Sequence, residues 1–93
     1  MPGWETRLYL IEYPPGVVAP RHAHPFVGIG YVLEGRFESA FEGETPTIVE
    51  SGRSFVDKAE VVHVLFRNPD PVHPLRFLIA YTIRKGEPQM HVV

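Results

Sequence analysis

The sequence predicts a single all-β domain, a sandwich or a barrel built from short antiparallel strands. Ten prolines and eight glycines in 93 residues lie in clusters between short apolar runs. Both residue types mark turns and are unfavourable inside helices, and no window of the chain has a convincing helical period of 3.6 residues. Seven or eight short strands separated by such turns are typical of all-β sandwiches and barrels.

The expected strands follow one another along the chain, and each ends at a turn. The first, TRLYLIEY, partly alternates between polar and apolar residues and ends at the Pro-Pro-Gly of residues 14–16. The last, LRFLIAYTI, is rich in β-branched and aromatic residues, which favour strands. The complete set is expected at residues 6–13, 22–33, 36–41, 47–49, 54–56, 61–66 and 75–83. No repeat or linker interrupts it, so residues 1–93 are expected to form one domain.

Composition narrows the possible partners. Hydrophobic residues make up 44% of the chain, charged residues 22%, and the formal net charge is −2, as in ordinary soluble globular proteins. There is no basic run to bind nucleic acid, no stretch of 18 apolar residues to span a membrane, and no secretory leader in the first residues. The expectation is therefore a cytoplasmic protein that acts on a small molecule, without nucleic-acid or membrane partners.

The small size of the chain predicts self-association. A domain of 93 residues buries only a modest share of its unfolded surface, so a partner subunit would add stability. Trp4 and the apolar positions of residues 6–13 are expected to pair or swap with a second copy. The predicted assembly is a homodimer.

Histidines are the candidate metal ligands, because the chain has no cysteine. His22 and His24 are two residues apart, so in a strand both side chains project to the same face, about 7 Å apart along the chain. His63 lies in a further apolar run, AEVVHVLF. If the two strands pair, three imidazoles converge inside the barrel.

The spacing of these residues resembles the two motifs of the cupin family. The first motif is a glycine, five residues, His-x-His, three or four residues, a glutamate, six residues and a glycine; the second has a glycine eleven residues before a histidine. The matching positions, which extend from Gly16 over more than half of the chain, are Gly16, His22, His24, Gly35, Gly52 and His63. The resemblance implies a small antiparallel jelly-roll β-barrel with a divalent metal held by His22, His24 and His63.

The chain departs from the first motif at its glutamate. Gly28 occupies that position, or Ile29 under the longer spacing, and neither side chain can bind a metal. Six residues still separate Gly28 from Gly35, so the spacing is intact and only the ligand is missing. In the second motif the expected proline, glycine and asparagine are replaced at positions 58, 60 and 67 by Lys, Glu and Arg, with Asn one residue later.

A centre of three neutral imidazoles predicts a particular chemistry. A divalent ion would keep its full charge and two or three open positions, which favour anionic bidentate ligands and can accept dioxygen or water. This ligand set is similar to that of the cupin thiol and diketone dioxygenases. Imidazole suits several ions, so Fe, Ni, Zn, Cu and Mn all stay open.

Five residues are candidates for the walls of a substrate pocket. Phe26, Gly28 and Gly30 share the parity of the histidines, so the glycines either leave an unfilled notch beside the metal or mark a bend at a barrel corner. Arg67, four residues after His63, is expected to face inward and bind a carboxylate, or to be a solvated residue at the strand end. Tyr81 is expected at the mouth. His73 and His91 are expected to be exposed rather than ligands.

Three functions from different classes follow. The first is a small metalloenzyme, dioxygenase-like, acting on a small anionic bidentate substrate. The second is a module that binds or senses a metal and a small ligand without turnover, and the third is a metal-free structural cupin. No acidic residue is expected on the inner face beside the histidines, which favours oxygen chemistry or plain binding over proton transfer.

Overall fold

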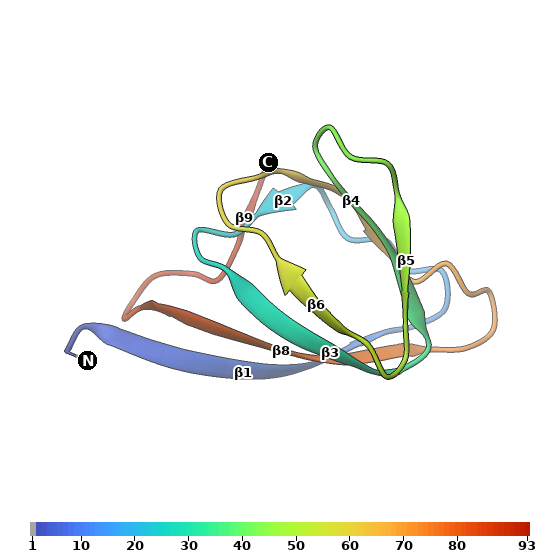
Figure 1. Cartoon of the computed structure of the whole chain (residues 1–93), viewed down its shortest axis with the longest axis horizontal. Coiled ribbons are helices and arrows are strands. Elements are labelled where there is room, and N and C mark those ends of the chain that lie inside the picture. The colour runs from blue at the N-terminus through green and yellow to red at the C-terminus, as the bar shows by residue number, and fades with distance from the viewer. Residues whose placement is uncertain (1) are drawn as a thin grey trace.

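The computed structural model describes residues 2–93, which form two antiparallel sheets folded over a common interior (Figure 1). One sheet has the strand order β1-β8-β3-β6 and the other β5-β4-β7-β2-β9. The strands are β1 (Trp4–Tyr13), β2 (His22–Ala23), β3 (Gly28–Glu34), β4 (Arg36–Phe41), β5 (Thr47–Glu50), β6 (Ser54–Asp57), β7 (His63–Arg67), β8 (Leu75–Arg84) and β9 (His91–Val92). The predicted small all-β jelly roll is confirmed. Within residues 2–93 no helix is long and apolar enough to cross a membrane.

The strand expected at residues 22–33 is two strands in different sheets. β2 lies in the five-stranded sheet and β3 in the four-stranded one. Pro25 stands between them; it lacks an N–H for a sheet ladder and restricts the residue before it, so the chain can cross from one sheet to the other here. The residues expected to face the interior still do so on both sides of this crossing: His22, His24, Gly28 and Gly30 are all buried.

The apolar core lies between the sheets, on the inner face of β8 and its neighbours. In β8 every second residue from Leu75 to Ile83 is buried, the period expected of a strand with one face on a core. Phe37 from β4 and Phe66 from β7 meet these residues from the opposite sheet, with ring centroids 4.7 Å apart. The inner face of β8 therefore runs from an aliphatic and aromatic region towards Tyr81, near the histidines.

A β-bulge in β7 changes which residues face inward. Against β4, Leu65 pairs with Ala40 and His63 pairs with Phe41, so Val64 is the extra residue. His63 and Phe66 are both buried, although Phe66 is three positions after His63 and a regular strand would place them on opposite faces. Arg67 is thereby turned outward, where its Nε donates to the Glu38 carboxylate at 2.6 Å. The expected inward parity of Arg67 with His63 is wrong for this reason.

Candidate metal centre

Three buried histidines from neighbouring strands form the candidate metal centre. β2 pairs with β7 so that His22 lies opposite His63, and His24 follows directly after β2. The His22 ring centroid lies 5.0 Å from that of His24 and 4.9 Å from that of His63. One ring nitrogen of each histidine lies within 4.8 Å of the corresponding atom of the others. The convergence expected from the sequence is therefore present.

Backbone carbonyls fix the orientation of two of the rings. The Nδ1–H of His22 donates to the Pro20 carbonyl, and that of His24 donates to the Gln89 carbonyl, each at 2.8 Å. A carbonyl oxygen can only accept, so Nδ1 carries a proton on both rings, and in the neutral ring Nε2 then has a free lone pair. Histidine ligands of metals are commonly oriented through their other nitrogen in this way.

Among the described residues 2–93, two ring nitrogens at the centre have no hydrogen-bond partner. They are His24 Nε2 and His63 Nδ1, and both lie in side chains that are at least 95% buried. The other nitrogen of His63, Nε2, is 2.6 Å from the Ser39 hydroxyl oxygen. A buried polar atom without a partner costs stability, and such atoms call for an explanation. A divalent ion among the three imidazoles would satisfy both, so the residues fit a metal.

An aspartate that the sequence did not predict as a site residue completes the cluster. Asp57 ends β6, is buried, and pairs with Gly28 of β3. Its Oδ2 lies 3.0 Å from His24 Nε2, and its Oδ1 lies 3.5 Å from His63 Nδ1. The Tyr81 hydroxyl donates to Oδ2 at 2.8 Å. The expectation that no acid faces the histidines is therefore wrong.

The electrostatics of the cluster are coupled through this carboxylate. Burial alone would raise the pKa of Asp57, but its contacts with His24, His63 and Tyr81 outweigh burial and hold that pKa below its usual range. Burial opposes charge on His24, yet the adjacent Asp57 raises the pKa of His24. Burial lowers the pKa of His22, and burial together with Asp57 raises that of Tyr81. Asp57 is therefore an anion next to the imidazoles.

The two glycines of β3 leave no empty notch. A Cβ atom at Gly28 would fall on the ring of Tyr81, and one at Gly30 would fall on the ring of Phe55. Neighbouring aromatic rings already occupy the volume that the missing side chains release. The predicted notch is therefore wrong, and glycine is required at both positions by close packing.

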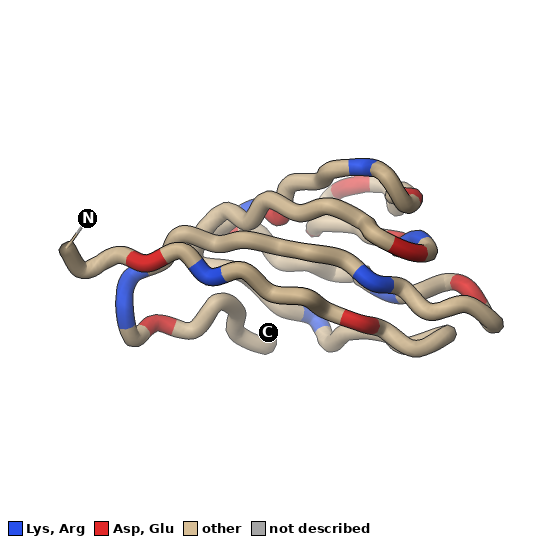
Figure 2. The backbone as a smooth tube through the Cα atoms, turned by 90° about the horizontal axis from the view of Figure 1, so that it is seen from below, with Lys and Arg blue, Asp and Glu red and all other residues tan. Residues whose placement is uncertain are grey.

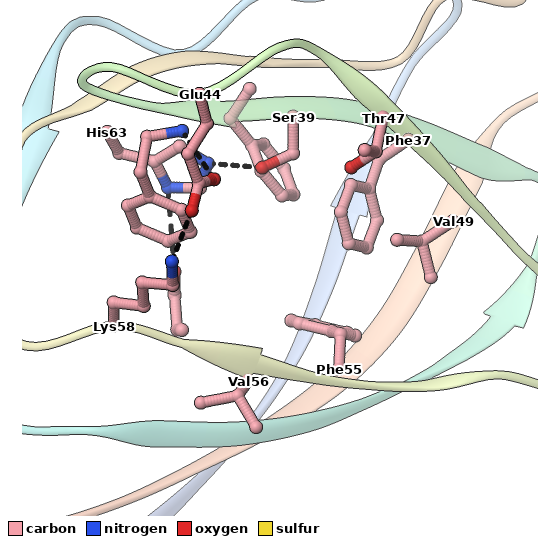
Figure 3. Close-up of a pocket in the computed structure, with 12 residues that line it drawn as sticks. Phe37, Ser39, Glu44, Thr47, Val49, Phe55, Val56, Lys58 and His63 are labelled. Carbon is pink, nitrogen blue, oxygen red and sulfur yellow. Dashed lines mark hydrogen bonds and ion pairs between the residues drawn. The ribbon is translucent and has the colours of Figure 1, made fainter.

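Two cavities meet at the cluster. An inner one of about 60 Å³ is lined by the three histidines, Asp57 and Tyr81, among others. An outer one of about 180 Å³ lies between β4, β5 and β6 (Figure 3), and His63 and Asp57 line both. The walls of the outer cavity are mainly apolar; they include Phe37, Phe41, Val49, Phe55 and Phe66.

The ammonium group of Lys58 lies at the edge of the outer cavity. Lys58 forms an ion pair with Glu44 from the turn after β4, and its Nζ lies 5.4 Å from the centroid of the Phe41 ring. Figure 3 shows Lys58 and Glu44 close to His63, on the side of the cavity away from Val49. Lys58 is also the residue that replaces the proline of the second motif.

The remaining pocket candidates lie in different places. Tyr81 belongs to the cluster, whereas Arg67 lies on the outer surface. Phe26 packs against Trp4, with ring centroids 5.5 Å apart, and is not among the residues that line either cavity. His73 and His91 are exposed, as expected.

Sequence signals for Asp57 were weak. It stands in Asp-Lys-Ala-Glu, where three of four residues are charged, and such a segment predicts a solvated turn. Asp57 lies opposite Gly28 because of the register between β3 and β6, and this register cannot be read from the sequence.

A jelly-roll barrel with inward histidines at these spacings defines a cupin-type protein. Residues 9–81 match the cupin domain family (Cupin_2), and the chain belongs to that family. No curated relative matches the chain by sequence.

Solved structures share the fold over almost the whole chain. The DMSP lyase DddQ from Ruegeria pomeroyi superposes with a TM-score of 0.79 at 24% identity, covering 95% of this chain and 43% of its own. A cupin-like protein from Thermotoga maritima gives 0.80 at 23%, with 95% and 64% covered. An oxalate oxidase in complex with the substrate analogue glycolate gives 0.76 at 20%, with 95% and 46% covered. This chain thus spans less than two thirds of each.

Proposed function

We propose that this cupin binds a divalent metal ion through His22, His24 and His63, and binds a small anionic molecule in the adjoining cavity. The observation that carries the proposal is the pair of buried, unpartnered nitrogens, His24 Nε2 and His63 Nδ1, in a cluster of three imidazoles. The ion, when bound, supplies a Lewis acid with an open position for a ligand. Fe, Ni, Zn, Cu and Mn are all compatible with this donor set.

The outer cavity suits a small molecule with an anionic group and an apolar part. Its aromatic walls favour burial of apolar surface, and His63 and Asp57 form its inner end. The Lys58 ammonium group at its edge can pair with a carboxylate, which would compete with Glu44 for the same cation. The oxalate oxidase in complex with the substrate analogue glycolate supports a small carboxylate as a ligand class for this fold.

For the reaction, we propose dioxygenase-like chemistry on the bound anion. His22, His24 and His63 are neutral donors, and the anion would enter beside them from the Lys58 edge. Asp57 favours an alternative, because a buried carboxylate beside the ligand site can act as a general base in proton transfer. A module that binds the anion without turnover is the third interpretation.

Metal analysis tests the central proposal. Protein produced with added Fe, Mn, Ni, Cu or Zn should hold close to one ion per chain, because three converging imidazole nitrogens bind divalent ions. His63→Ala should lose the ion, whereas the exposed His73→Ala should not. Less than about a tenth of an ion per chain in the unmodified protein contradicts the proposal and supports the metal-free structural cupin.

Turnover assays separate the enzyme from the binding module. Oxygen uptake should be measured on the metal-loaded protein with panels of thiols, diketones, catechols and small carboxylates. Proton transfer is followed as hydrogen–deuterium exchange at carbon in the same compounds. Lys58→Ala should weaken binding of anionic compounds and leave metal content unchanged. Binding of an anion without oxygen uptake or exchange across the panel would support the binding module.

We further propose that the chain forms a homodimer through the outer face of the four-stranded sheet. Leu8, Ala80, Ile29 and Val56 form one continuous apolar row across β1, β8, β3 and β6. Leu8, Ile29 and Val56 are 68%, 65% and 58% exposed. Figure 2 shows that the central stretches of β8 and β3 carry no charged residue. Such a face is typical of an interface, and a two-fold axis would let it pack against itself.

The interface that we propose keeps Leu8 from the expected segment, residues 6–13, but not Trp4. Trp4 is half-buried and packs within its own chain, against Phe26 and beside Arg84. Light scattering coupled to size exclusion should give a dimer for the unmodified protein and a monomer for Ile29→Glu. If the unmodified protein is monomeric at high micromolar concentration, that result contradicts the proposed dimer.

A further inference from the structure

We infer that Asp57 is a fourth ligand of the metal centre, so that the centre consists of three histidines and one aspartate. The inference rests on the proposed metal site and deepens it. The contacts of Asp57, its position opposite Gly28, and the hydrogen bond from Tyr81 each support it.

The Asp57 oxygens lie where a ligand next to two imidazoles must lie. Metal–nitrogen and metal–oxygen bonds of about 2.0–2.2 Å place adjacent donor atoms about 3–3.5 Å from each other. The distances from the carboxylate to His24 Nε2 and to His63 Nδ1 are 3.0 and 3.5 Å. These are the same two nitrogens that have no hydrogen-bond partner. The nitrogens thus approach the carboxylate as closely as fellow ligands do, at ion-pair distance but without a hydrogen bond to it.

The strand register explains how the carboxylate reaches the cluster. Gly28 and Asp57 are direct partners in the pairing of β3 with β6. Side chains of directly opposite residues project to the same face of a sheet, a few ångströms apart. Asp57 therefore brings a carboxylate to the same face of the sheet as position 28, which has no side chain. Both residues are buried, which places that face inside the barrel.

Tyr81 orients the carboxylate and explains why position 28 has no side chain. Gly28 also pairs with Tyr81, on the other side of β3. The Tyr81 ring fills the space above Gly28 and stacks on His24, with centroids 5.1 Å apart and planes 24° apart. Its hydroxyl donates to Asp57 Oδ2. One oxygen of the carboxylate is thus fixed by a neutral donor, as is common for ligating carboxylates.

An aspartate ligand changes the properties of the centre. Its negative charge lowers the formal charge of the loaded site from two to one, so the attraction for a dianionic ligand weakens. Carboxylate oxygen also adds a hard donor to the imidazoles, which moves the preference towards ions that accept mixed nitrogen and oxygen ligands. A carboxylate held as a ligand is not free to act as a general base, so the inference disfavours the proton-transfer alternative.

Carbon-13 NMR on the unmodified protein gives the most direct test. Asp57 and Asp70 are the two aspartates of the chain, so labelling aspartate at the carboxylate carbon yields two signals. Asp70 is an internal control, because its carboxylate accepts from the backbone amides of Val72 and His73 in a loop. Titration with Zn²⁺ should shift the Asp57 signal and leave the Asp70 signal in place. Full zinc binding with neither signal moved would overturn the inference.

Variants test the same ligand by affinity and by spectroscopy. Asp57→Asn should weaken Zn²⁺ binding by more than about 100-fold, the upper end of what loss of an outer hydrogen-bond partner costs. The visible spectrum of the Co²⁺-loaded protein should change as well. Tyr81→Phe removes only the hydrogen bond to Asp57, so it should cost about 10-fold to 100-fold and keep the spectrum.

The outcomes separate this inference from the proposed function. An unmodified protein that binds no metal contradicts both. A protein that binds one ion, with an Asp57→Asn variant of unchanged Co²⁺ spectrum, keeps the metal site and rejects Asp57 as a ligand. Circular dichroism of the apo variants checks folding, and the NMR titration stands even if Asp57→Asn does not fold.

Discussion

The two ends of the barrel interior are built from the same strands but have opposite chemistry. At one end the apolar side chains of Leu75, Phe77 and Phe37 pack against one another. At the other, β7 and β8 contribute His63 and Tyr81 to a cluster that contains a buried carboxylate and two unpartnered nitrogens. Apolar burial stabilises a fold, whereas buried polar atoms without partners cost stability. The apolar end should therefore stabilise the fold, and the histidine end should provide the function.

The largest expected effect is at the apolar end. Leu75 is fully buried, so Leu75→Ala should reduce the free energy of unfolding by about 2–5 kcal/mol through lost burial and a cavity. Zinc affinity of the folded variant should stay unchanged, because Leu75 lines neither cavity at the cluster. Urea unfolding and zinc competition measure the two properties. Leu8→Ala, at a 68% exposed position, is the matched control and should cost about 0.5 kcal/mol or less in the monomer.

The boundary between the two ends lies between two glycines of β3. At Gly30 an added Cβ meets the Phe55 ring and also lies 2.8 Å from the Leu78 carbonyl oxygen, a backbone atom that cannot rotate away. Gly30→Ala should cost about 1–3 kcal/mol of stability by overpacking and leave zinc affinity unchanged. Gly28→Ala should cost a similar amount.

Gly28→Ala should differ from Gly30→Ala in its effect on the metal. It displaces Tyr81, which donates to Asp57, so zinc affinity should fall about 10-fold or more. Measuring both variants by urea unfolding and zinc competition sharpens the comparison. Equal zinc affinities for the two variants would mean that the cluster does not depend on the position of Tyr81.

The sequence could predict most of the strands and the histidines because both follow local rules. Alternation within TRLYLIEY and LRFLIAYTI, and turns at proline and glycine, need no knowledge of the partner strand. His22, His24 and His63 were found from their spacing. Asp57 could not be found in this way, because its role depends on the register of β6 against Gly28, between segments far apart in the chain. The filled space beside Gly28 and Gly30 likewise comes from rings on other strands.

The smallest expected effect concerns Arg67, which the period of a regular strand places inside the barrel. The bulge at Val64 shifts that period by one residue, so Arg67 leaves the interior and pairs with Glu38 on the surface. Arg67→Ala should therefore leave zinc affinity and anion binding unchanged and cost about 0–1 kcal/mol of stability, the range of an exposed ion pair. Glu38→Ala and the double variant complete a cycle that isolates this pair. A loss of anion binding in Arg67→Ala, with Lys58→Ala silent, would mean that the anion enters over β7 rather than past Lys58.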